Sequence, residues 1–80
     1  MDDKSIMSHI NELVDEEHAL RDAEAAGTID DPGRDRMQAL EVELDRTWDL
    51  LRQRRARRDF GENPDEAHER PAQVVEKYLQ

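Results

Sequence analysis

Apolar residues recur at helical spacing in two long segments of the chain. In the first, residues 4–26, the repeating positions lie four, three, four and three residues apart. This heptad spacing is typical of a helix that packs along a single seam. The seam is formed by Ile6, Ile10, Leu13, Glu17 and Leu20. Val14 widens it on one side, Ser5 or Asp3 is expected to cap the helix, and Gly27 is expected to follow its end.

The second segment, residues 34–59, repeats the same spacing. Its seam is formed by Met37, Leu40, Leu44, Thr47 and Leu51. Trp48 widens this stripe on one side. The connection "GTIDDPG", residues 27–33, contains Pro32, which suits the first turn of a helix capped by Asp31. The Pro-Gly pair could instead hold a turn and delay the start of the helix to about residue 34.

Two helices of similar length joined by a short loop predict an antiparallel hairpin. At about 1.5 Å per residue, the two segments would be about 35 and 39 Å long. Residues 60–70 are expected to form a polar linker, and residues 71–80 a short helix that is too short to be stable alone in water. Its apolar side would be formed by Val74, Val75, Tyr78 and Leu79. The prediction is an all-α fold in one small domain, residues 1–80.

Two helices cannot cover stripes that are widened by Val14 and Trp48. Either the C-terminal segment covers the remainder, or a second hairpin does, and we favour a coiled-coil-like pairing of two hairpins into a four-helix bundle. A monomer with an exposed Trp48 is the alternative. The residues expected at the contact between copies are Ile10, Val14, Leu44, Trp48 and Leu51.

Composition limits the class of protein. Only 35% of the 80 residues are hydrophobic and 41% are charged, so the core is small and a partner would help to stabilise it. Cysteine is absent, which excludes disulfides and thiolate metal sites. We find no apolar run long enough to span a membrane, and the first residues do not form a signal peptide. A cytoplasmic location is therefore expected.

The net charge of -9 is unevenly distributed. Residues 1–31 carry ten acids and two bases, residues 32–58 carry five acids and eight bases, and residues 59–80 carry six acids and two bases. The chain is thus acidic, then basic, then acidic. Opposite charges in one chain can neutralise each other before any partner binds.

The basic part ends in the stretch "WDLLRQRRARRDF", residues 48–60. Its five arginines are Arg52, Arg54, Arg55, Arg57 and Arg58. They could contact phosphate or another anion. The hairpin, however, would bring them close to Asp2 and Asp3, and further acids follow directly in the sequence. Cations also stabilise a helix C-terminus. We therefore favour neutralisation within the assembly, and nucleic acid is the less favoured partner because aromatic side chains suited to base stacking are missing.

A metal site is a weaker possibility. Asp15 and His18 are three residues apart in the first helix, and Glu41 and Asp45 are one turn apart in the second. Carboxylate and histidine side chains on facing helices hold two metal ions in ferritin-like bundles. Those side chains must project inward, whereas His18 lies beside the seam, so no metal or other cofactor is predicted.

Glu17 is the polar member of the first seam. A carboxylate there is costly if it loses water without gaining a partner. The simpler interpretation is a solvated edge with a salt bridge to Arg21, one turn further on. The alternative is a polar seam position that fixes register or oligomeric state.

No catalytic motif is found in the sequence. The stretch "ALEVELDRTWDLLRQRRARR" is superficially similar to the first helix of an AroQ-type chorismate mutase, but that family begins with its long helix. We find no nucleophile with a positioned base and no glycine-rich phosphate loop. The sequence therefore predicts a protein that is not an enzyme.

As a whole, the chain resembles DUF2630, a family of small actinobacterial proteins of unknown function. The resemblance rests on "IMSHINELVDEEHALR", "ALEVELDRTWDLLRQRRARRDFGENPDEA" and "RPAQVVEKY", in that order. It implies that the three blocks form one unit and that the last belongs to the fold. It supplies no functional residues. We therefore predict a structural or protein-interaction module that forms homo-oligomers, with a possible unidentified protein partner, and with anion or nucleic-acid binding as the alternative.

Overall fold

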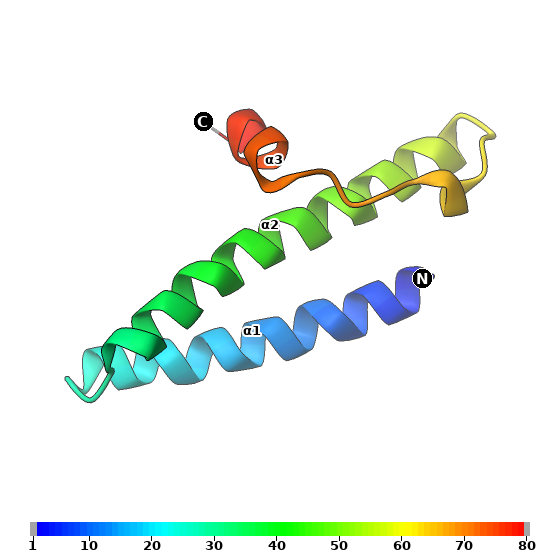
Figure 1. Cartoon of the computed structure of the whole chain (residues 1–80). Helices are drawn as coiled ribbons and strands as arrows, with labels where there is room; N and C mark the ends of the chain where they lie inside the picture. Colours follow the sequence, from blue (N-terminus) through cyan, green and yellow to red (C-terminus); the bar gives the residue numbers. More distant parts are fainter. Residues whose placement is uncertain (1, 80) are drawn as a thin grey trace.

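The computed structural model describes residues 2–79, and the side chains of residues 2–77. These residues form three α-helices, α1 (Asp3–Ala25), α2 (Asp31–Asp59) and α3 (Ala72–Leu79), with a short 3-10 turn, η1 (Pro64–Glu66), before the last. No strand is present in this range. The two long helices pack against each other in antiparallel directions, and α3 lies on the side of α2 away from α1 (Figure 1). The predicted all-α fold with two packed long helices is confirmed.

Helix α1 begins one residue earlier than the sequence suggested. Its cap is Asp2, whose side chain accepts a hydrogen bond of 2.8 Å from the backbone N–H of Ser5. Neither Ser5 nor Asp3 is the cap, because both already have helical backbone. The other end is as expected, since Gly27 has a φ of 72° and its N–H and that of Thr28 bond back into the last turn. This pair of bonds is a Schellman motif.

Helix α2 begins at Asp31, three residues before the predicted start. The cap is Asp30, whose side chain accepts a 2.8 Å hydrogen bond from the N–H of Gly33. Glycine is needed here for space, because a Cβ at this position would lie 2.8 Å from the side chain of Ile29. The helix therefore includes the Pro-Gly pair in its first turn, and Gly61 closes its far end with a φ of 74°.

The core lies between α1 and α2 and extends to α3. Its buried apolar residues are Ile6, Ile10, Leu13, Leu40, Leu44, Leu50, Leu51 and Val75. Met7, Val14 and Leu20 pack against its edge. Glu17 stays at the edge with a salt bridge of 3.4 Å to Arg21, as the simpler interpretation predicted. None of the described helices is both long and apolar enough to cross a membrane.

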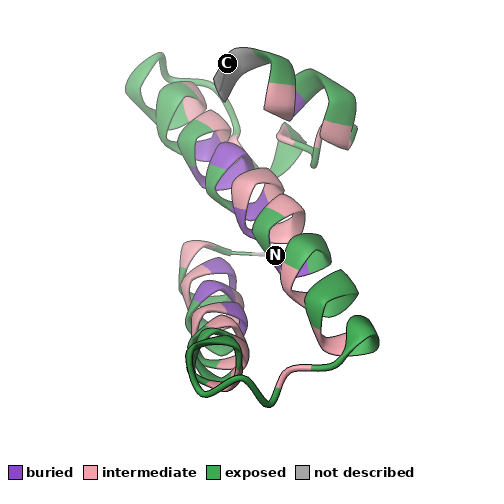
Figure 2. Cartoon of the chain, turned by 90° about the vertical axis from the view of Figure 1, so that its left-hand side faces the viewer, coloured by how far each residue is buried: buried purple, intermediate pink, exposed green. Residues whose placement is uncertain are grey.

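The segment after α2 folds back along that helix. Arg46 donates a hydrogen bond of 3.0 Å to the carbonyl oxygen of Arg70, and Gln53 donates one of 2.8 Å to that of His68. These bonds hold the segment before α3 against α2. Helix α3 then packs on α2, and its Val75 is 1% exposed. Buried residues concentrate along the facing sides of the helices (Figure 2). The side chains of Tyr78 and Leu79, predicted on the apolar side of this helix, lie outside the described residues.

Candidate functional site

Arg54 is the buried centre of the arginine segment. Its side chain is 7% exposed and donates hydrogen bonds of 2.7 Å to Asp3, 2.9 Å to Asp65 and 3.2 Å to the carbonyl oxygen of Pro64. The guanidinium therefore joins the start of α1 to the turn that follows α2. The hydrogen bonds from Arg54 and then Arg58 hold the pKa of Asp3 below its usual range.

Two further arginines also have partners in their own chain. Arg58 donates a hydrogen bond of 2.6 Å to the second carboxylate oxygen of Asp3. Arg57 lies 3.2 Å from Glu62 and 3.6 Å from Glu66, both in the segment that follows the helix. Three of the five arginines are thus neutralised by the chain itself, in support of the favoured interpretation of the block.

Arg52 and Arg55 differ from the other three. Both are exposed, and neither forms an ion pair with any acid of residues 2–77. They lie four and seven residues after Trp48, so all three side chains share one face of α2. Trp48 itself is 37% exposed, so part of its indole surface faces solvent beside these two arginines. This face combines an apolar centre with two free cations.

A second buried ion pair was not predicted from the sequence. Asp49 is 4% exposed and accepts a bidentate pair of hydrogen bonds from Arg70 and a third bond of 2.9 Å from Gln53. The hydrogen bond from Arg70 is the main reason that the pKa of Asp49 lies below its usual value. Its partner is 21 residues away in a polar linker, and no periodic signal in the sequence joins the two positions.

The predicted metal candidates are not assembled into a site. Asp15 and His18 are exposed on α1, whereas Glu41 bonds to Arg21 at 3.1 Å. Asp45 shares a hydrogen bond with Glu76 of α3, and this bond, followed by loss of water, raises the pKa of Glu76. Across the described residues, no three carboxylate or imidazole side chains are grouped so that they could hold a metal ion.

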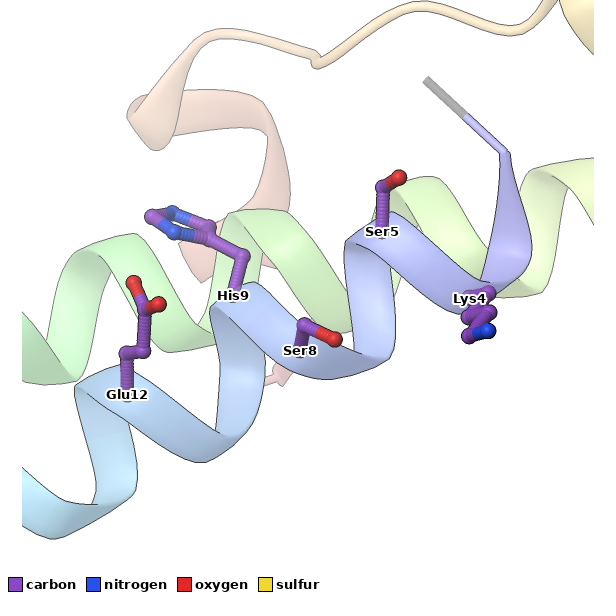
Figure 3. A pocket seen from close by; sticks show the side chains of 5 residues that line it. All are labelled: Lys4, Ser5, Ser8, His9 and Glu12. Atoms are coloured by element: carbon purple, nitrogen blue, oxygen red, sulfur yellow. The ribbon is translucent and has the colours of Figure 1, made fainter.

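An open hollow of about 350 Å³ lies on the surface of α1. It is lined by Lys4, Ser5, Ser8, His9 and Glu12 (Figure 3). The described contact of His9 is with Glu43 of α2 at 3.6 Å, and no hydrogen bond joins it to either serine. The hollow therefore does not present a serine with a positioned base.

The residues predicted to join two copies fall into two groups. Ile10, Leu44 and Leu51 are at most 8% exposed and are already buried between α1 and α2 of one chain. The intramolecular seam takes up these side chains within one chain, and their assignment to a contact between copies stays a prediction. Val14 is partly buried and Trp48 is the most exposed of the set, so these two remain available at the surface.

Fold and surface together define a small all-helical protein whose longest helix carries an exposed tryptophan and two arginines without an ion pair among the described residues. The chain matches the family described as protein of unknown function DUF2630 over residues 2–80. It is also 46% identical, over 77 residues, to uncharacterized proteins of Mycobacterium bovis and Mycobacterium tuberculosis, covering 95% of this chain and 88% of each relative. The chain therefore belongs to the DUF2630 family. No solved structure matches it.

Proposed function

We propose that this protein is a non-catalytic interaction module that associates with other copies of itself through the face of α2 around Trp48. The observation that carries the proposal is the 37% exposure of Trp48 beside two exposed arginines that form no ion pair within the described residues. Tryptophan and arginine are the side chains most enriched at the energetic centres of protein interfaces. The module would act in the reducing cytoplasm, in keeping with the absence of cysteine from the chain.

The exposed part of Trp48 gives the scale of the effect. An aromatic side chain of this size has an area of about 250 Å². Covering the exposed 37% removes about 90 Å² from water in each chain. At about 25 cal/mol per Å², this contributes about 2 kcal/mol per chain. Two such contributions support a reversible contact, while flanking charges add selectivity rather than large affinity.

Sedimentation velocity over a wide range of protein concentration tests the proposal. The wild-type protein should pass from monomer to oligomer as concentration rises, and Trp48→Ser should shift that transition to higher concentration. Phe60→Ser is the matched control, because Phe60 is an aromatic residue that is 83% exposed at the end of α2. A strict monomer at millimolar concentration, or equal effects of the two substitutions, would refute the proposal.

Binding to an anionic partner is the second candidate function. It is supported by Arg52 and Arg55, which have no ion-pair partner in the described part of the chain. Two free guanidinium groups can contact few phosphates, so such binding would be weak and would fall steeply with salt. Retention on a polyanion column at low salt, lost in Arg52→Gln/Arg55→Gln but kept in Arg57→Gln, would support it. Absence of retention of the wild-type protein would remove it.

A further inference from the structure

Five residues of α2 form a single row that we call the outer row. It consists of Glu41, Asp45, Trp48, Arg52 and Arg55. Their spacing of four, three, four and three residues places them along one face of the helix. Two acids occupy one end of the row, two bases occupy the other, and Trp48 lies at the centre. The row is therefore close to antisymmetric in charge about Trp48.

The basic end of the outer row forms no ion pair within the described residues, and the acid whose pKa is affected by the charge of Arg52, Asp49, is itself bonded to Arg70. Arg54, Arg57 and Arg58 bond to acids of α1 and of the segment after α2, but these acids do not pair with Arg52 or Arg55. Each step of one residue along a helix rotates the side chain by 100° about the axis. Arg52 and Arg55 therefore point away from the acids that pair with Arg54, Arg57 and Arg58. The two guanidinium groups are exposed.

The acidic end of the outer row has the opposite imbalance. Asp45 shares a hydrogen bond with Glu76 of α3, and Glu41 adds further negative charge to the same place. One carboxyl oxygen of Glu76 is buried and has no hydrogen-bond partner among the described residues. Arg21 lies 3.1 Å from Glu41, so it compensates only one of these three carboxyl groups directly. This end of the row therefore has an excess of negative charge.

We propose that two copies of this chain pair their α2 helices in antiparallel directions about a two-fold axis at Trp48. This inference rests on the proposed function, and it adds the register and the symmetry of the contact. Arg52 of each copy faces Asp45 of the other, and Arg55 faces Glu41 of the other. The two Trp48 side chains meet at the centre. The contact is isologous, so it closes as a dimer and leaves no unsatisfied end.

The spacing of the outer row supports this register. Arg55 and Glu41 each lie seven residues from Trp48, which is about 10.5 Å along the helix. Arg52 lies about 6 Å from Trp48 and Asp45 about 4.5 Å on the other side, so the two rows match within about 1.5 Å. In a parallel pairing, Arg52 would face Arg52 and Asp45 would face Asp45. Repulsion between like charges disfavours that arrangement.

The antiparallel pair also connects the dimer contact to the docking of α3. Each Arg52 would approach the Asp45–Glu76 pair of the other copy and supply the cation that this pair lacks. The ionised form of Glu76 would then become more favourable where α3 meets α2. Dimer formation should therefore tighten the attachment of α3, whose single fully buried apolar side chain in the described range is Val75.

A charge-swap experiment tests the register. One variant carries Arg52→Glu/Arg55→Glu, and the second carries Glu41→Lys/Asp45→Lys. In a dimer of either variant alone, like charges face each other. Losing each of the four ion pairs should raise the dimer dissociation constant roughly two- to threefold, which gives about 30-fold in total. An equimolar mixture restores opposite charges at all four positions. Both variants keep a net negative charge, so non-specific attraction between them is not expected.

Sedimentation velocity of the separate variants and of the mixture gives the result, with far-UV circular dichroism to confirm that each is folded. The matched control is Lys4→Glu/Arg34→Glu, which changes the net charge as much as the first variant but lies outside the outer row. The proposal is supported if each variant is monomeric alone and the mixture forms a dimer of wild-type mass. The dimer dissociation constant of the control should change little. If wild type dimerises through Trp48 but the mixture stays monomeric, the register is overturned while the proposed function stands. If wild type does not dimerise, both fall.

Discussion

Replacing Arg54 by alanine should destabilise the fold far more than replacing Arg55, its immediate neighbour. Arg54 has a side chain that is 7% exposed and three hydrogen-bond acceptors, two of them carboxylates. Arg55 is exposed and has no ion pair within the described residues. The two substitutions remove the same side chain from adjacent positions of one helix, so helix propensity is matched between them.

The size of the effect follows from what each partner of Arg54 retains. A fully orphaned buried charge costs about 3–5 kcal/mol. Asp3, however, would keep its bond of 2.6 Å to Arg58, and Asp65 has a side chain that is 74% exposed and can be solvated by water. The loss is therefore that of three hydrogen bonds at about 1 kcal/mol each, together with some packing of the arginine stem, or about 2–4 kcal/mol. Arg55→Ala should stay within about 0.5 kcal/mol of wild type.

Thermal unfolding followed by far-UV circular dichroism measures both variants. For a domain of this size about 1 kcal/mol corresponds to about 4–8 °C, so Arg54→Ala should lower the Tm by about 10–25 °C and Arg55→Ala by less than about 4 °C. Arg54→Lys should be intermediate, since an ammonium group cannot hold the two carboxylates in the planar geometry of guanidinium. Equal Tm values for the two alanine variants would show that Arg54 does not join α1 to the turn after α2.

Two further substitutions test the attachment of the C-terminal segment through its pH dependence. Asp49→Asn removes the bidentate pair with Arg70. Because the pKa of Asp49 is lowered in the folded chain, the lost stability should be full at pH 7, should begin to fall only below about pH 4, and should disappear below the lowered pKa. Glu76→Gln should act in the opposite direction, because the pKa of Glu76 is raised by its bond to Asp45 and its ionised form weakens the folded state. The glutamine variant should be more stable than wild type at pH 7 and equal to it at pH 4, by thermal unfolding at both values. A pH-independent difference in either case would contradict the assigned cause.

The core between the long helices could be predicted because both seams repeat with a strict heptad spacing. Ile6, Ile10, Leu40 and Leu44 are buried as their spacing indicated. The seam does not account for the other side of α2, where Leu50 is buried and Asp49 is bonded to Arg70 of the returning segment. That segment is held by arginine and glutamine side chains bonded to backbone carbonyl groups, which any sequence can supply. Such contacts produce no hydrophobic period that a sequence could reveal.

The helix starts illustrate a second limit of the sequence. Asp2, Asp3, Asp30 and Asp31 are all chemically suitable caps. The choice depends on which residue leaves the helix with an extended backbone, and this is decided by neighbouring contacts. At α2 the cap is Asp30, which accepts the N–H of Gly33, and the missing Cβ of that glycine leaves room for Ile29. The result is a helix that is longer by three residues at the loop end than the delayed start at residue 34 would give.

The arginine segment shows why a block of like charges can have two roles. Consecutive residues of a helix point in different directions, so a single layer of neighbouring acids cannot reach all five guanidinium groups. The acids of α1 and of the segment after α2 reach Arg54, Arg57 and Arg58, which stabilise the fold. Arg52 and Arg55 lie on the side of Trp48 and form no ion pair within the described residues, although the charge of Arg52 acts on nearby Asp49. This surface, which carries the exposed Trp48 and two arginines without an ion pair among the described residues, is the one on which the proposed contact between copies rests.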